Sequence, residues 1–122
     1  MPRPLPPVSR DAINGELLRQ LPGHDPRTIK VEVRTLDTWS AKHEPGPIDF
    51  IWADIQGAEG DLVAGGRDTL ARTKYVYTEC FDHEFYEGAP TRVALLDMLP
   101  GFEVVKLYES DILLRNAALT SP

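Results

Sequence analysis

The sequence is poor in cysteine, in positive charge and in long apolar runs. Cys80 is its only cysteine, so no disulfide can form within the chain, which fits a reducing compartment. The formal charge of −6 leaves no basic face of the kind that nucleic acid or an anionic membrane surface attracts. No run approaches the roughly 18 apolar residues of a membrane-spanning helix, and the N-terminus lacks a signal-like apolar segment. We therefore expect a cytoplasmic protein that binds neither nucleic acid nor membrane.

The composition is that of a globular domain. Hydrophobic residues make up 42% of the 122 positions and charged residues 26%, which does not match the low hydrophobicity of a disordered chain. Residues 1–27 are expected to form a Pro-rich arm and a short helix, and residues 28–118 the main domain. The helix is predicted over 11–21, where apolar residues recur at helical spacing: Ile13, Leu17, Leu18 and Leu21.

Strand-like and helix-like segments alternate along the main domain. Strands are predicted over 28–36, 49–53, 75–79, 102–108 and 112–116. Helices are predicted over 37–43, 58–70 and 91–99, the second of them broken at Gly65-Gly66. Asp37 or Thr38 is the expected cap of the first helix and Thr91 that of the last. This alternation favours a parallel sheet with helices on both faces. The last two strands are separated only by "ESD", which predicts an antiparallel hairpin. The unbroken apolar run Phe50–Trp52 predicts a strand covered on both faces.

Carboxylates follow two of the predicted strands. Asp54 comes directly after one strand, Glu79 ends the next, and Asp82 and His83 lie in the loop beyond it. Ligands of open α/β sheets bind beyond the carboxyl ends of the strands, and parallel neighbours lie about 4.8 Å apart, so Asp54 and Glu79 converge if their strands are adjacent. His83 is a candidate base, because histidine is the side-chain type that ordinarily exchanges protons near neutral pH. The alternatives are a turn or cap role for Asp54 and a solvated acidic loop, which we favour over a metal site.

Five motifs in order carry a family resemblance, which covers roughly residues 29–116. They are Thr35-Leu36-Asp37, Asp54-Ile55-Gln56-Gly57-Ala58-Glu59, Gly65-Gly66, Glu79 and Gly101-Phe102. With them the chain resembles the carboxyl half of an FkbM-family methyltransferase. The resemblance implies S-adenosylmethionine as cofactor and methyl transfer to a hydroxyl of a sugar, glycan or secondary metabolite. It also implies a partial class I, Rossmann-like three-layer sandwich, with a mostly parallel sheet and a C-terminal antiparallel hairpin.

The resemblance and the strand-end rule together define candidate site residues. The candidate catalytic residues are Asp54, Glu79 and His83. The candidate cofactor-binding residues are Asp54, Gln56 and Asp37, and the candidate substrate-binding residues are Glu59 and Asp82. Two structural alternatives stay open: Asp37 can cap the helix that follows it, and Glu59 can stabilise a helix dipole from the first turn.

The sequence departs from the family pattern before Ile29. Class I methyltransferases have a glycine-rich cofactor loop after their first strand, and residues 1–28 contain none. We therefore expect a truncated or degenerate family member. One hypothesis is an enzyme that needs a further N-terminal segment. The alternative is a non-catalytic remnant that binds a partner, or itself, through an open sheet edge.

Overall fold

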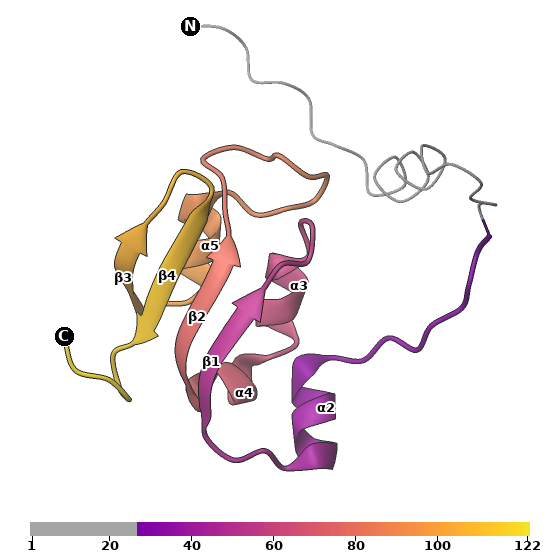
Figure 1. Ribbon diagram of the computed structural model, residues 1–122, viewed down its shortest axis with the longest axis horizontal. Coiled ribbons are helices and arrows are strands. Elements are labelled where there is room, and N and C mark those ends of the chain that lie inside the picture. The colour runs from indigo at the N-terminus through magenta and orange to yellow at the C-terminus, as the bar shows by residue number, and fades with distance from the viewer. Residues whose placement is uncertain (1–26) are drawn as a thin grey trace, which may run out of the picture.

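The structure, a computed structural model, describes residues 27–122. The predicted arm and the helix over 11–21 lie outside the described residues. The elements, shown in Figure 1, are α2 (Leu36–His43), β1 (Ile48–Ala53), α3 (Glu59–Ala64), α4 (Arg67–Ala71), β2 (Thr73–Glu79), α5 (Arg92–Met98), β3 (Phe102–Leu107) and β4 (Asp111–Asn116). None of the helices in this part of the chain is long and apolar enough to cross a membrane.

The four strands form one mixed sheet in the order β1-β2-β4-β3. Strands β1 and β2 pair in parallel, whereas β4 is antiparallel to both β2 and β3. The predicted C-terminal hairpin is therefore confirmed, but the prediction of a mostly parallel sheet is wrong for the described residues. The physical reason is the position of β4. It lies between β2 and β3, so the one reversed strand makes two antiparallel pairings.

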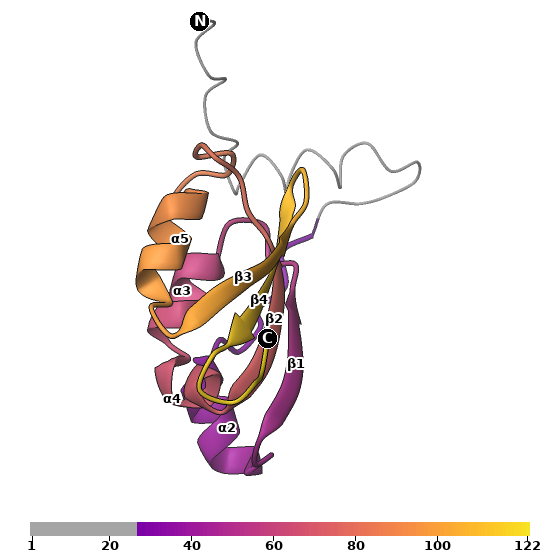
Figure 2. The same cartoon turned by 90° about the vertical axis from the view of Figure 1, so that its left-hand side faces the viewer.

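The helices cover one face of the sheet. Figure 2 shows α2, α3, α4 and α5 on the same side of the strands. The described residues thus form two layers, and the prediction of a three-layer sandwich with helices on both faces does not hold for them. Strand β1 shows the consequence. It was predicted to be covered on both faces, but Phe50 is 52% exposed and Trp52 is 71% exposed.

The core lies between the sheet and these helices. Strand β4 alternates buried and half-buried residues, and Ile112 and Leu114 are fully buried on the helix-covered face. The other buried core residues are Val63, Leu70, Val76, Cys80, Leu95 and Leu99. Burying an aliphatic side chain of this size contributes about 1.5–3 kcal/mol. Cys80 is a buried free cysteine.

The strand predicted over residues 28–36 is absent. Residues 27–35 have no regular secondary structure, and Ile29, Val31 and Val33 are 79%, 70% and 88% exposed. An alternating pattern becomes a strand only when a neighbour completes its hydrogen-bond ladder, and none of the described strands pairs with this segment.

The segment leads into α2, whose N-cap is Thr35: the Thr38 amide donates to its hydroxyl at 3.0 Å. The predicted caps, Asp37 and Thr38, are instead inside the helix.

Glycines separate α3 from α4, as predicted. A methyl group on Gly66 would lie 2.7 Å from the Leu62 carbonyl oxygen and 2.9 Å from the Leu36 side chain. The absence of a side chain at this point therefore lets α2 approach the break between the two short helices. Thr91 is the N-cap of α5, again as predicted, since its hydroxyl accepts from the Ala94 amide at 3.2 Å.

Candidate active site

The carboxyl ends of β1 and β2 bring Asp54 and Glu79 together. The two strands are parallel neighbours with Ala53 opposite Thr78, so Asp54 and Glu79, which follow these two residues, lie side by side at this edge of the sheet. Both line a cavity of about 170 Å³, whose other walls are Trp52, Ala53, Tyr77 and Asp111. We refer to this cavity and its lining residues as the carboxyl-edge site. It contains three carboxylates and two aromatic rings.

Asp111 was not predicted as a site residue. It opens β4 and lies opposite Glu79 in the antiparallel β2–β4 register. The Tyr77 hydroxyl donates a hydrogen bond to Asp111 Oδ2 at 2.8 Å, and this bond raises the pKa of Tyr77 above its ordinary value. The sequence signal that could have found Asp111 is its position at the start of the last strand. It becomes informative only once β4 is known to lie beside β2.

Glu79 lies in an environment that disfavours ionisation of its carboxyl group. It is half-buried, and burial, followed by the negative charges of Asp54, Glu59 and Asp111, raises its pKa above the ordinary value. The Tyr86 hydroxyl donates a hydrogen bond to Glu79 Oε1 at 3.5 Å. This hydrogen bond acts to lower the pKa of Glu79, against the effects of burial and of the neighbouring charges. A carboxylate with a raised pKa binds a proton more readily near neutral pH, which is the property of a general base.

The turn after β1 is held in an uncommon backbone conformation. Gln56 and Gly57 have positive φ angles of 54° and 99°, and the Gln56 amide donates to Asp54 Oδ1 at 3.4 Å. A methyl group on Gly57 would lie 2.6 Å from Tyr86 Cβ. The glycine therefore allows the loop between β2 and α5, residues 80–91, to close over the turn and brings Tyr86 to Glu79.

Glu59 begins α3 and is 5% exposed. It does not line the cavity, but its charge contributes to the raised pKa of Glu79. Glu59 therefore influences the carboxyl-edge site electrostatically without lining it. Its predicted role in substrate binding stays a prediction.

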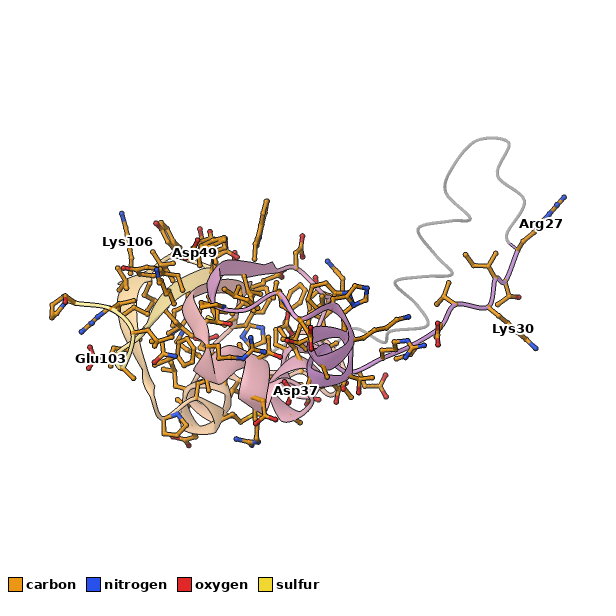
Figure 3. The ribbon with its side chains drawn as sticks, turned by 90° about the horizontal axis from the view of Figure 1, so that it is seen from below. Arg27, Lys30, Asp37, Asp49, Glu103 and Lys106 are labelled. Carbon is orange, nitrogen blue, oxygen red and sulfur yellow. The ribbon has the colours of Figure 1, made fainter. Side chains whose placement is uncertain are left out.

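Asp37 lies on the helix side of the molecule, away from the sheet, as Figure 3 shows. Its carboxylate accepts hydrogen bonds from the Thr69 amide at 2.9 Å, the Thr69 hydroxyl at 2.7 Å and the Asp68 amide at 3.2 Å. Burial acts to raise the pKa of Asp37, but these hydrogen bonds outweigh it, and the pKa lies below its ordinary value. Asp37 thus caps α4 and fastens it to α2. Its predicted contact with the cofactor stays a prediction.

His83 and Asp82 pair with each other in the loop over residues 80–91. His83 Nδ1 lies 2.7 Å from Asp82 Oδ1, and this hydrogen bond lowers the pKa of Asp82. The imidazole is close to the rings of Phe81 and Phe85, at centroid distances of 5.9 and 6.1 Å. Neither Asp82 nor His83 lines the cavity. Within residues 27–122, no group of three or more His, Cys, Asp or Glu side chains is arranged to hold a metal ion.

Comparison with known proteins agrees with the motifs. The methyltransferase FkbM domain matches residues 5–107, and this match begins before Ile29, where the resemblance seen in the motifs starts. A relative from Sinorhizobium fredii, described as "2-O-methyltransferase NoeI", is 48% identical over 95 residues, which are 75% of this chain and 39% of that protein. No solved structure matches significantly. The mixed α/β fold and these matches define a methyltransferase-type domain. More narrowly, the chain belongs to the FkbM methyltransferase family.

Proposed function

We propose that the carboxyl-edge site serves S-adenosylmethionine-dependent methyl transfer to a hydroxyl group of a sugar, glycan or secondary metabolite. Family membership supports methyl transfer, and the relative's description as a 2-O-methyltransferase supports oxygen as the acceptor atom. The observation that carries the proposal is the pairing of Asp54 with a Glu79 carboxyl group of raised pKa at one strand edge.

The residues of the site fit a cationic methyl donor. Asp54, Glu79 and Asp111 give the cavity three carboxylates, and opposite charges attract strongly in a partly buried site. Asp54, with the Gln56 amide that donates to it, would hold the cofactor. When bound, S-adenosylmethionine supplies an electrophilic methyl group on a positively charged sulfur.

Glu79 would accept the proton that the acceptor hydroxyl loses. Its raised pKa, caused first by burial and then by the neighbouring carboxylates, brings its proton affinity closer to that needed near neutral pH. The Tyr86 hydroxyl at 3.5 Å orients the carboxylate. Asp111 would accept a hydrogen bond from another hydroxyl of the acceptor and fix its orientation, which is a large part of catalysis in group transfer.

The test is transfer of a radiolabelled methyl group from S-adenosylmethionine to a panel of hydroxyl acceptors by the purified chain. We expect Glu79→Gln to lower the rate by about 10²–10⁴-fold, the usual contribution of a general base. Asp97→Asn, a change of an exposed carboxylate on α5, is the matched control and should leave the rate unchanged. Equal rates for the wild type and Glu79→Gln would remove Glu79 from catalysis.

A second candidate function is a non-catalytic module that binds a partner chain. The exposed aromatic side chains of β1 favour it. A folded chain that neither binds S-adenosylmethionine nor transfers its methyl group would refute the first proposal for this chain and support the second.

A further inference from the structure

A second cavity, of about 320 Å³, is bounded by α3, α4 and α5 and by the ends of β3 and β4. It reaches the core, because Val63, Leu70 and Leu99, which are 3%, 3% and 6% exposed, are among its lining residues. Arg67 also belongs to the lining, and we call this cavity the Arg67 pocket. An apolar cavity of about 150 Å³ holds one benzene molecule, so the Arg67 pocket has room for a larger apolar body.

Of the described residues that line the pocket, Arg67 alone is charged. It is exposed, and no carboxylate within residues 27–122 forms an ion pair with it. The polar side chain of Asn116 also lines the pocket, but its hydrogen bonds are made within the protein. Its amide donates to the carbonyl oxygens of Leu70 and Ala71 at 3.3 Å each, and its Oδ1 accepts from the Ala118 amide at 3.2 Å. A ligand therefore meets apolar walls and one positive charge.

The Arg67 pocket is remote from the carboxyl-edge site. In Figure 1 the carboxyl ends of β1 and β2 point up, whereas α4 and the end of β4 lie at the bottom. Asp111, which lines the carboxyl-edge site, begins β4, and Asn116, which lines the Arg67 pocket, ends it. The steps between these two residues of an antiparallel strand add up to about 17 Å. A small molecule in the pocket therefore does not contact the residues proposed for methyl transfer, and the two sites can be tested separately.

We propose that the Arg67 pocket binds a small monocarboxylic acid whose apolar body is an aryl or alkyl group larger than benzene. The apolar body leaves water to contact Val63, Leu70 and Leu99, which is favourable in proportion to the apolar area that it buries. The carboxylate pairs with the guanidinium of Arg67 through charge-assisted hydrogen bonds, which this pair of groups forms in a bidentate geometry. A polyanion would gain nothing from the apolar walls, and a hydrocarbon would leave Arg67 without an anionic partner. This proposal does not depend on the proposed function.

Titration of the folded full chain with 2-naphthoate, followed by NMR of the methionine methyl groups, tests the proposal. The sequence has two methionines, and one of them, Met98, lines the pocket; its signal is assigned with Met98→Leu. We expect the Met98 methyl resonance to shift until the site is saturated, because the naphthalene ring lies beside this methyl group. The matched ligand is 2-naphthylmethanol, which has the same ring system without the charge. It should bind about tenfold more weakly, since an exposed charge-assisted hydrogen bond contributes at the lower end of the usual range.

Two variants separate the charge of the pocket from its apolar walls. Arg67→Gln removes the charge at an exposed position and should weaken the binding of 2-naphthoate by about tenfold while leaving that of 2-naphthylmethanol unchanged. Its matched control is Arg34→Gln, a change of an exposed arginine outside the lining, which should alter neither affinity. Ala118→Phe adds a ring at an exposed position of the lining and should weaken the binding of both ligands. Ala94→Phe, at an exposed position of α5 outside the lining, should weaken neither.

Three results would overturn the proposal. A Met98 resonance that does not move in the folded wild type would show that the pocket takes no such ligand. Equal affinities of the wild type and Arg67→Gln for 2-naphthoate, or of 2-naphthoate and 2-naphthylmethanol for the wild type, would show that Arg67 does not select an anion. Unchanged binding by Ala118→Phe would place the ligand elsewhere on the molecule, such as on the exposed aromatic side chains of β1.

Discussion

Replacement of Gly57 by alanine is expected to lower the free energy of unfolding by about 2–4 kcal/mol. The φ angle of +99° is unfavourable for any residue with a side chain and costs on the order of 1–3 kcal/mol. The new methyl group would lie 2.6 Å from Tyr86 Cβ and 3.3 Å from Ala89 Cβ, so the backbone of the loop must move, and such overpacking costs about 1–3 kcal/mol. We expect the lower part of the range given by the sum of the backbone cost and the overpacking cost, because the loop is half-exposed and can move.

Denaturant unfolding of the variant at pH 7 measures this effect, and Gly46→Ala is its control. Gly46 also has a positive φ, of +70°, but a methyl group there meets nothing within 4 Å, so this variant isolates the backbone cost of about 1–2 kcal/mol. A further comparison is Gly57→Ala combined with Tyr86→Gly, which removes the contacting Cβ atom. The combined loss should be smaller than the sum of the single losses by about 0.5 kcal/mol or more. Equal losses for Gly57→Ala and Gly46→Ala, with additive double substitution, would show that Tyr86 does not pack on the turn.

Three further variants probe other contacts. Asp37→Ala should lower the free energy of unfolding by about 1–2 kcal/mol, because it removes the cap of α4. The pKa of Asp37 in the folded chain lies below the ordinary 3.8, so the full effect of the substitution is expected above pH 3.8 and a smaller effect as the pH falls through the folded pKa. Urea unfolding at pH 7 and pH 3 measures this difference. Glu79→Gln should raise the free energy of unfolding at pH 7, because a pKa raised above 4.5 means that folding disfavours the charged form of Glu79. At pH 3 the same substitution should change the free energy of unfolding little. A lower free energy of unfolding at pH 7 would contradict this. Gly101→Ala should raise the melting temperature through a gain of about 0.4–1 kcal/mol, because its φ is not positive and its new methyl group meets nothing within 4 Å; a lower melting temperature would refute it.

The features that could be predicted from the sequence are those that local physics determines. Gly65-Gly66 stops a helix because glycine is a poor helix former, and the structure has the break there. Thr91 precedes a helical apolar pattern and is the cap. The three residues between the last two strands permit only a hairpin, which is confirmed. Asp54 and Glu79 were selected from their positions at strand ends, and they line one cavity.

The features that the sequence did not reveal depend on which elements become neighbours. The segment containing Ile29, Val31 and Val33 has the alternation of a strand but finds no partner among the described residues. Asp111 enters the site only because β4 pairs with β2, and hydrophobic patterns do not specify that order. Residues 50–53 of β1 are all apolar, so this part of its sequence could not show that one of its faces is exposed. For α2, both Thr35 and Asp37 belong to the residue types that cap helices, and only the geometry shows that Asp37 caps α4 instead.

The most direct measurement of the central claim is calorimetric titration of the folded full chain with S-adenosylmethionine, for the wild type and for Asp54→Asn. If the carboxyl-edge site serves methyl transfer, the wild type binds the cofactor. Asp54→Asn, which removes a charge from the cavity while keeping its shape, then weakens binding by about tenfold or more, equivalent to at least 1.4 kcal/mol. A folded wild-type chain that releases no heat of binding, or an Asp54→Asn variant that binds equally well, would contradict the account.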